Sequence, residues 1–363
     1  MTTITTSIDD WLAEYGQWTT PDHEMYLLLG GCLLSVKANH PRIIEEARDY
    51  FAFFVAEPGT PDISIEVFEN DSLPVKHDYT VKQPDPGKIK CKEEFLELDN
   101  GRVVRKRLTG MVFAFGGSRH VAVGPCLSNM NQVVNFINNR YIQWLLHRGH
   151  LLGHAAGVRS EKFGLAMAGF SGMGKSTLAL HLMSKGSTFV SNDRLLVANE
   201  NGQPVMRGVP KQPRVNPGTI LSLPELEGTI DRSDVVWLRS LPPKDLWNLE
   251  QKHDIIIESV YGDGRFQLEA PFTALILLNW KHGHSGTEVK RVDLEQRRDL
   301  LPAFMKETGL FYQTDGTGPA NRSEEDYLQV LSNCKVYEAS GQIDFEYASR
   351  VAQRILETGD VEG

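Results

Sequence analysis

Hydrophobic residues recur along the chain at two different spacings, and these spacings separate predicted helices from predicted strands. Apolar side chains three and four positions apart are typical of helices with one buried face. This spacing predicts helices at 9–15, 41–55, 127–147, 175–184, 294–308, 324–331 and 345–358. Short runs rich in β-branched and aromatic residues, bounded by Gly, Pro, Asn and Asp, predict strands. These runs lie at 25–36, at intervals between 63 and 123, and at 150–158, 163–168, 188–190, 274–280 and 335–339.

The order of the predicted elements indicates two domains. A chain of 363 residues exceeds one average domain and is long enough for a catalytic domain with a smaller partner. The strands between 63 and 123 have the punctuation of an antiparallel meander, whereas the run ALILLNW at 274–280 is apolar enough for a buried central strand. We expect an α/β protein with an α+β N-terminal domain at 1–126, a connecting helix at 127–149 and a catalytic domain at 150–363.

Composition and charge exclude several classes of partner. The hydrophobic fraction of 41% and the charged fraction of 23% are typical of soluble globular proteins. A net charge of -9 repels a polyphosphate backbone, so we expect no nucleic-acid partner. The four cysteines are scattered without a CxxC pair, which indicates neither a zinc site nor a disulfide framework. The acidic N-terminus and the short apolar runs predict a cytoplasmic protein that does not enter a membrane.

A phosphate-binding loop is the strongest motif in the sequence. Residues 169–176 read GFSGMGKS, a complete match to GxxxxGK[ST] between a predicted strand and a predicted helix. In such loops backbone N–H groups surround the phosphates, the lysine reaches the β and γ phosphates, and the next hydroxyl binds Mg²⁺. The predicted nucleotide-binding residues are Gly169, Phe170, Ser171, Gly172, Met173, Gly174, Lys175, Ser176 and Thr177. The motif identifies a nucleotide site but no reaction, because kinases, hydrolases and switches share it.

Phosphoryl transfer also needs an acidic residue for the metal and a base for the acceptor, and two residues are candidates. Asp193 ends the run FVSND, 18 residues after Lys175, so a helix and a returning strand could bring it back to the loop. We predict that Asp193 shares Mg²⁺ with Ser176; an aspartate that caps a turn is the alternative. His154 lies 15 residues before Gly169, on the preceding predicted strand. A histidine in an apolar strand is more often a core group, so its position alone assigns no role.

His154, the loop GFSGMGKST and the pair Asn192-Asp193 together resemble the catalytic core of HPr kinase/phosphorylase. Within that family the chain is most similar to the group called HPr kinase-related kinase B. The spacings of the histidine, the loop and the acidic pair agree with the family, and the resemblance covers about residues 140–215. It implies a catalytic domain of the P-loop, phosphoenolpyruvate-carboxykinase-like type, similar to the C-terminal domain of HPr kinase. The implied activity is transfer of the γ-phosphate of ATP to a serine hydroxyl with Mg²⁺.

The sequence departs from the family pattern at one acidic position. The first aspartate of the family pair, which is the acid/base there, is Asn192 here. An amide cannot accept a proton at neutral pH. The task therefore passes to Asp193 or His154, or the chain is a weak kinase. The family's acidic signature is also reduced to Met206-Arg207-Gly208-Val209, with no Glu before the arginine.

Basic residues after the core are candidates for binding anions. Arg207, Lys211 and Arg214 lie in a Pro-, Gly- and Arg-rich segment, 203–218, that we predict as an ordered loop region. They are predicted to hold the nucleotide or the acceptor, with solvated loop charges as an equally weighted alternative. Arg265 lies in the part of the chain where the family has its second basic loop, and is a candidate catalytic residue. The HGH run at 282–284 has no third ligand at zinc spacing and is better interpreted as a solvated turn.

The sequence therefore predicts a kinase that uses ATP and Mg²⁺. His154, Lys175, Asp193 and Arg265 are its predicted catalytic residues. The acceptor is a serine of a protein substrate or the hydroxyl of a small molecule. An ATP-binding regulatory protein with weak or no transfer is the alternative, made plausible by Asn192. The sequence leaves open the acceptor, a reverse phosphorylase activity, the role of the N-terminal domain and whether the chain forms a homo-oligomer.

Overall fold

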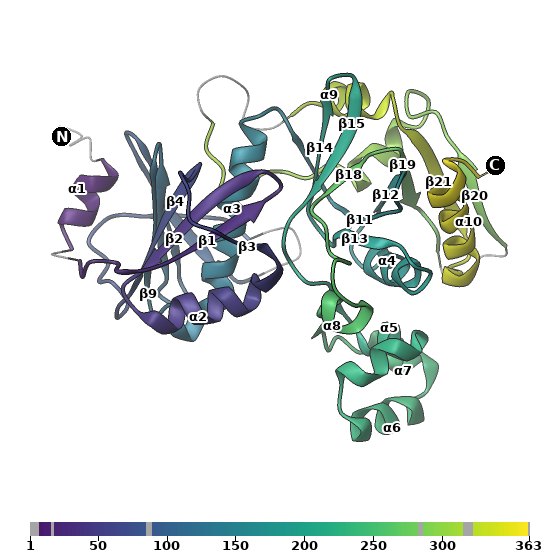
Figure 1. Ribbon diagram of the computed structural model, residues 1–363, viewed down its shortest axis with the longest axis horizontal. Coiled ribbons are helices and arrows are strands. Elements are labelled where there is room, and N and C mark those ends of the chain that lie inside the picture. The colour runs from purple at the N-terminus through teal and green to yellow at the C-terminus, as the bar shows by residue number, and fades with distance from the viewer. Residues whose placement is uncertain (1–6, 16–17, 85–88, 282–285, 315–321, 362–363) are drawn as a thin grey trace. The chain divides into compact units, whose positions relative to one another are not determined.

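The computed structural model describes residues 7–15, 18–84, 89–281, 286–314 and 322–361. They form a mixed α/β protein with several sheets, in agreement with the expected class (Figure 1). Contacts between Cα atoms divide the chain into two compact units. The described residues of Met1–Arg148 and Thr308–Ala320 form the first unit, and those of Gly149–Glu307 and Asn321–Gly363 form the second. In the described part of the chain no helix is both long and apolar enough to cross a membrane.

The first unit is built on a sheet with the strand order β3-β1-β2-β4-β9-β8-β7-β6-β5. Its elements are α1 (Ile8–Ala13), β1 (His23–Leu29), β2 (Cys32–Ala38), α2 (Pro41–Tyr50), η1 (Ala52–Phe54), β3 (Val55–Ala56), β4 (Ile63–Glu69), β5 (Thr80–Val81), β6 (Glu93–Leu98), β7 (Gly101–Lys106), β8 (Val112–Gly116), β9 (Arg119–Gly124), η2 (Leu127–Asn129) and α3 (Met130–Leu146). Strands β6 to β9 pair antiparallel, but β4 runs parallel to both β2 and β9. The expected antiparallel meander is therefore wrong for β4, because α2 forms a crossover from β2 that a hairpin turn cannot provide.

A late segment of the chain belongs to the first unit. The Phe311 ring stacks on Phe115 with centroids 5.6 Å apart and also contacts Phe136 of α3. The guanidinium of Arg140, which is 1% exposed, donates a hydrogen bond to the Phe311 carbonyl and lies over the Phe115 ring. These contacts link the described residues 308–314 to the first unit, whereas the expected division assigned them to the catalytic domain.

The second unit contains a central sheet with the order β13-β11-β12-β19-β21-β20 and a smaller sheet with the order β10-β14-β15-β18. Its elements are β10 (Leu151–Gly153), β11 (Ala155–Arg159), β12 (Gly164–Ala168), α4 (Lys175–Ser184), β13 (Thr188–Ser191), β14 (Leu195–Glu200), β15 (Gln203–Gly208), β16 (Arg214–Val215), α5 (Pro217–Ser222), η3 (Pro224–Thr229), α6 (Arg232–Ser240), α7 (Pro243–Asn248), β17 (His253–Asp254), α8 (Ile257–Tyr261), β18 (Glu269–Pro271), β19 (Ala274–Leu278), β20 (Thr287–Arg291), η4 (Arg298–Ala303), α9 (Glu324–Leu331), β21 (Lys335–Gly341) and α10 (Phe345–Thr358). Strands β12, β19 and β21 run parallel, and every residue of β19 is buried, as predicted for the run at 274–280.

Layers cover both faces of the central sheet. Helices α4 and α10 pack against each other and against β12 (Figure 1). The opposite face forms a core with the smaller sheet, η4 and α9, through residues such as Leu195, Leu301 and Leu328. Burial of β19 on both faces explains its continuous apolar sequence. The layers place the loop that follows β12 at the C-terminal end of a fully buried strand.

Three sequence predictions in the second unit need correction. The expected strand at 150–158 is two strands, because the chain leaves the smaller sheet after β10 and enters the central sheet at β11. The expected loop region at 203–218 contains β15, which forms a hairpin with β14, followed by β16 and the start of α5. The expected helix at 294–308 is only the 3₁₀ segment η4, which contains Pro302. A proline inside a helix removes a hydrogen bond and limits its length.

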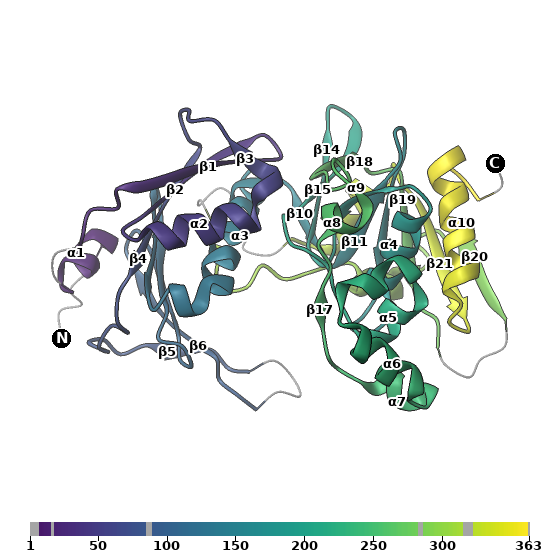
Figure 2. The ribbon, with the colours of Figure 1, turned by 60° about the horizontal axis from the view of Figure 1, so that its bottom comes forward.

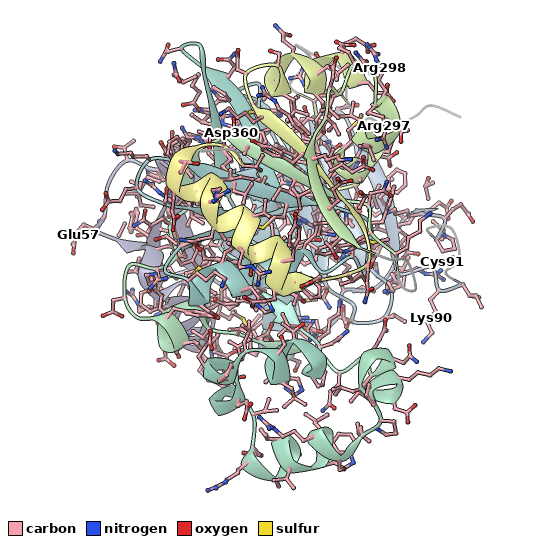
Figure 3. All side chains as sticks on the ribbon, turned by 90° about the vertical axis from the view of Figure 1, so that its right-hand side faces the viewer. Glu57, Lys90, Cys91, Arg297, Arg298 and Asp360 are labelled. Carbon is pink, nitrogen blue, oxygen red and sulfur yellow. The ribbon has the colours of Figure 1, made fainter. Side chains whose placement is uncertain are left out.

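Helices α5, α6 and α7 form a group that the sequence did not predict (Figure 2). The hydroxyl of Thr219 in α5 lies 2.8 Å from the hydroxyl of Thr177 in α4. Asp360, labelled in Figure 3, lies just beyond the C-terminal end of α10. Its carboxylate accepts hydrogen bonds from Lys335 at 2.6 Å and Tyr337 at 3.0 Å. These two β21 residues thereby tie the C-terminal end of α10 to the sheet. The N-terminal end of α10 is then fixed beside the loop.

Candidate functional site

Three strand ends meet at one edge of the central sheet. Ala155, the first residue of β11, pairs with Ala168, the last residue of β12. Strand β13 is antiparallel to β11 and so runs in the same direction as β12. The residue before β11, the loop after β12 and the residues after β13 therefore lie at the same edge. These are His154, the segment 169–174 and Asp193, which the sequence analysis had selected separately.

The loop 169–174 has the backbone that an anion nest requires. Gly172 and Gly174 both have φ of +83°, in the left-handed region that favours glycine. Helix α4 begins directly after Gly174, at Lys175, so its free N–H groups face the loop. The carbonyl of Met173 accepts a hydrogen bond from the Trp280 indole at 3.0 Å. The hydrogen bond from Trp280 thus holds the loop in place, and the loop amides lie at the sheet edge.

The other residues of the loop and of the first turn of α4 differ in how far they are buried. Gly169 is buried, and a Cβ there would lie 3.1 Å from the Cβ of Leu278. Phe170 is 57% exposed, and Ser171 is exposed as well. Ser176 is half-buried in the first turn of α4. The hydroxyl of Thr177 faces α5 through its contact with Thr219, so the structure gives it a role in packing.

Lys175 lies buried at the mouth of the loop. The residue is only 8% exposed. Its Nζ atom donates hydrogen bonds to the carbonyls of Gly169 at 2.7 Å and Phe170 at 3.3 Å. Burial lowers the pKa of Lys175 to about 8, against the opposing attraction of Asp193, and the charges of Lys306 and Lys252 lower it further. A buried ammonium is costly without an anion to compensate it. A phosphate bound in the loop would supply that compensation.

Asp193 is the centre of the ionic contacts at this edge. Its Oδ1 atom lies 3.0 Å from Nε2 of His154, and its Oδ2 atom lies 3.5 Å from Nζ of Lys306. Burial by itself would raise the pKa of Asp193, but the hydrogen bond from His154 and the charge of Lys306 outweigh it and hold the pKa well below the usual range. The carboxylate is therefore ionised at neutral pH. An ionised carboxylate at this position can accept a hydrogen bond or bind a metal ion.

More basic side chains surround this carboxylate. Burial lowers the pKa of Arg194, and the negative charge of Asp193 opposes that shift. Loss of hydration and the neighbouring charge of Arg194 lower the pKa of Lys211, although the residue still reaches solvent. Arg214 also acts on Lys211, and its own guanidinium lies 3.2 Å from Asp254. The structure thus brings Lys211 to the site, with the exposed Arg214 at its margin.

Two predicted site residues are engaged elsewhere. Arg207, in β15, forms ion pairs with Glu200 at 2.9 Å and with Glu269, and so links strands of the smaller sheet. Arg265 donates hydrogen bonds to the carbonyls of Met183 and Ser187, at the C-terminal end of α4. The loop lies at the opposite end of that helix. The structure therefore does not bring Arg265 together with the loop.

Sequence reasoning missed Arg194, Lys252 and Lys306. Arg194 directly follows Asp193, so its position beside the predicted metal ligand was a usable signal. Lys252 lies just before β17, which pairs with β16, and Lys306 lies after η4. No motif in the sequence connects these two lysines to the loop. Lys306 comes close to Asp193 only because distant segments pair, and Lys252 is an exposed residue whose charge lowers the pKa of Lys175.

The donors at this edge fit a magnesium nucleotide. Mg²⁺ is usually held by one or two carboxylates together with substrate phosphates and waters. The Asp193 carboxylate and the Ser176 hydroxyl are such a donor set beside a phosphate nest. Among the described residues, at this edge or any other place, no cluster of three or more His, Cys, Asp or Glu could hold a metal on its own. The HGH run at 282–284 lies outside the described residues.

Asn192 is half-buried, but its Oδ1 atom is buried and has no hydrogen-bond partner. Burying an unsatisfied carbonyl oxygen costs free energy, and such atoms in native structures often have a functional explanation. The neighbouring Ser191 uses its hydroxyl to donate to the Arg194 carbonyl at 2.5 Å. The turn at 191–194 is therefore fixed internally, and the Asn192 amide is held inside it.

Comparisons with known proteins give little beyond the residues themselves. No protein-family model matches the chain, and no curated protein matches it. Among solved structures, the Hpr(Ser) kinase/phosphatase from Coxiella burnetii aligns at 14% identity and a TM-score of 0.28, covering 57% of this chain and 95% of that one.

Proposed function

We propose that this chain is an ATP- and Mg²⁺-dependent phosphotransferase whose second unit is a P-loop catalytic domain of the HPr kinase-like type. One observation carries the proposal: the complete phosphate-loop motif follows a buried strand and opens helix α4, with Asp193 and His154 at the same sheet edge. A chance glycine turn does not explain the buried Lys175 or the ionised Asp193 beside it. Both are expected where phosphoryl charge must be neutralised.

Different residues of the site would bind different parts of the magnesium nucleotide. Backbone N–H groups at the start of α4 would bind the phosphate oxygens, and Lys175 would neutralise charge on the β and γ phosphates. Ser176 and Asp193 would hold Mg²⁺. The metal, when bound, offsets negative charge on the phosphates. Lys211 and Arg194 lie close enough to Asp193 to contribute further positive charge.

The proposed reaction transfers the γ-phosphoryl group to a hydroxyl. The bond between the γ phosphorus and the bridging oxygen breaks, and ADP leaves with that electron pair. The acceptor oxygen forms a new bond to phosphorus, and its proton passes to a base. We assign this base to His154, because its Nε2 atom is held 3.0 Å from Asp193, which orients the ring. Asn192 cannot take the proton.

A serine of a protein substrate is the acceptor that the resemblance to HPr kinase favours, and a small-molecule hydroxyl is the alternative. Asn192 supports a second candidate function, an ATP-binding regulatory protein with little or no transfer. Its amide, with a buried oxygen, stands where the resembled family has a proton-accepting carboxylate. In that case nucleotide binding would persist without a labelled product.

An experiment with γ-labelled ATP separates these functions. Purified protein is incubated with labelled ATP, Mg²⁺ and host lysate, and label on protein is resolved from label on metabolites. We expect transfer by the wild type, about 100-fold less by Lys175→Ala and by Asp193→Ala, and wild-type transfer by Lys290→Ala. Lys290 is a suitable control because its ammonium pairs with Glu288 on β20, at 2.8 Å.

Each outcome of this experiment has a distinct meaning. Label on protein identifies a protein kinase, and label on a metabolite identifies a small-molecule kinase. ATP binding without transfer identifies the regulator. A wild-type chain that does not bind magnesium nucleotide in a calorimeter would refute the nucleotide assignment altogether.

A further inference from the structure

Lys306 reaches the candidate site through backbone pairing between distant segments. The Lys306 amide donates to the Leu152 carbonyl at 3.2 Å, and the His154 amide donates to the Phe304 carbonyl at 2.6 Å. Between these two bonds, Gly153 and Met305 form an antiparallel bridge. The pairing fixes the backbone of Lys306 relative to that of His154. Both side chains then reach the same carboxylate.

The two contacts on Asp193 use different oxygens. His154 lies 3.0 Å from Oδ1, and Lys306 lies 3.5 Å from Oδ2, with the lysine side chain 29% exposed. The positive charge of Lys306 also lowers the pKa of Lys175. The Lys306 ammonium is therefore the cation at Oδ2 of Asp193, whereas His154 contacts Oδ1. A partly exposed lysine in this place can move without breaking the core.

A metal ion and the Lys306 ammonium would compete for the same carboxylate. In the proposed function Asp193 holds Mg²⁺, and two positive charges a few ångströms apart repel each other. The His154 contact at Oδ1 leaves Oδ2 as the oxygen at which this competition occurs. A flexible four-carbon side chain lets the displaced ammonium seek another anion nearby. The phosphoryl group in transfer is the strongest anion that the proposed reaction brings to this edge.

We infer that Lys306 is a further residue of the phosphoryl-transfer site, and this inference rests on the proposed function. Its ammonium is the counter-ion of Asp193 in the structure, and it moves to the transferring phosphoryl oxygens when Asp193 binds the divalent cation. The bonds that form and break are those of the transfer described above. Lys306 forms no covalent bond and stabilises only the charge on the phosphoryl oxygens. A positive charge placed there acts where negative charge develops.

Removing the Lys306 charge should change the affinity for a divalent cation and the rate of phosphoryl transfer in opposite directions. Removing the Lys306 charge removes the competitor for Asp193, so the affinity for a divalent cation should rise. It also removes a cation from the phosphoryl group, so the rate should fall. A purely structural ion pair at a partly exposed site predicts neither effect, because its loss changes stability only slightly. A damaged fold would lower the metal affinity and the rate together.

The test measures Mn²⁺ binding by the EPR signal of the free ion, in the presence of the β,γ-imido analogue of ATP. The rate is measured separately, as transfer of label from γ-labelled ATP to the acceptor in host lysate. We expect Lys306→Gln to bind Mn²⁺ about 5-fold more tightly than the wild type and to lose about 100-fold in rate. Lys306→Arg should restore the wild-type Mn²⁺ affinity and part of the rate. Lys290→Gln, on β20, is the matched control and should change neither quantity.

The failure of the inference and the failure of the proposed function have different signatures. If the wild type binds the ATP analogue but Lys306→Gln has wild-type metal affinity and rate, only the inference is overturned. Weaker Mn²⁺ binding by Lys306→Gln, together with a lower rate, would also overturn it in favour of a structural role. A wild type that binds no nucleotide would overturn the proposed function, and the inference with it.

Discussion

The Nε2 atom of His154 lies 3.0 Å from the Oδ1 atom of Asp193, although 39 residues separate the two in the sequence. The contact follows from strand direction, since His154 precedes β11 and Asp193 follows β13, which is antiparallel to it. The resulting pair resembles a general base held by a carboxylate, an arrangement common to many catalytic sites. It connects the phosphate loop to the site where an acceptor proton would leave.

The His154 and Asp193 side chains should act as one unit. We expect His154→Ala and Asp193→Ala each to lower the transfer rate about 100-fold, and the double variant to be little slower than Asp193→Ala alone. The reason is that His154 without Asp193 loses its orientation. Initial rates of label transfer from γ-labelled ATP to the acceptor in host lysate, at saturating ATP, measure the effect. Losses that multiply in the double variant would contradict the assigned pairing.

Nucleotide affinity should decrease as the pH rises through about 8. Burial lowers the pKa of Lys175 to about 8 in the folded chain, so the ammonium that is proposed to bind the phosphates is lost above that pH. Between about 8 and the ordinary value of 10.5, the unfolded chain binds more protons, so the free energy of unfolding should rise with pH. Titration calorimetry with an ATP analogue measures the first effect, and denaturant unfolding the second.

Lys175→Met provides the control for this pH dependence. Without a titrating group at position 175, both curves should lose their change near pH 8, although binding is weaker throughout. A wild-type affinity that stays constant from pH 7 to about 10 would show that the buried ammonium does not govern binding.

Two glycines of the loop offer a matched pair of substitutions. Gly172 and Gly174 have the same φ of +83°, but a Cβ at Gly174 would overlap the Phe345 ring, whereas at Gly172 nothing lies within 4 Å. We expect Gly172→Ala to cost about 1 kcal/mol of stability from backbone strain alone. Gly174→Ala should cost about 2 kcal/mol more through overpacking, and it should abolish nucleotide binding. Thermal unfolding and calorimetry compare the two, and equal losses would refute the contact with Phe345.

Replacing Asn192 by aspartate tests whether the missing carboxylate limits the reaction. The Asn192 side-chain oxygen is buried without a partner, beside the ionised Asp193. A carboxylate there could accept the acceptor proton, so we expect Asn192→Asp to raise the transfer rate about 10-fold. Asn192→Ala, which removes the amide without adding a base, is the control. An unchanged or lower rate in Asn192→Asp would show that His154 already suffices or that the site cannot use a second carboxylate.

The Phe311 ring should stabilise the first unit. It stacks on Phe115 and contacts Phe136, while the buried Arg140 binds its carbonyl. We expect Phe311→Ala to lower the free energy of unfolding of this unit by about 2 kcal/mol, because the ring is only partly buried. Phe53→Ala, at a side chain in the same unit that is 50% exposed, should cost less than about 0.5 kcal/mol. Denaturant unfolding with a probe in the first unit distinguishes the two variants, and equal losses would contradict the packing.

The sequence alone determined the local parts of the site. The GxxxxGK[ST] motif predicted the loop and the first residue of α4, because glycine backbone geometry and helix initiation depend on neighbouring residues. The apolar run at 274–280 likewise predicted a buried strand from its own residues, and β19 is that strand. Helices α9 and α10 were also predicted from spacing, and their N-terminal caps, Ser323 and Asp344, lie where local hydrogen bonding places them.

Only the tertiary structure decided which distant residues share the site. Lys306 has no local signal, since it reaches Asp193 through pairing of segments far apart in the chain. Tertiary contacts also engage Arg207 with Glu200 and Arg265 with the far end of α4, although both were predicted site residues. Local geometry fixes a loop, but the free energy that selects its distant neighbours comes from strand pairing and core burial across the whole unit.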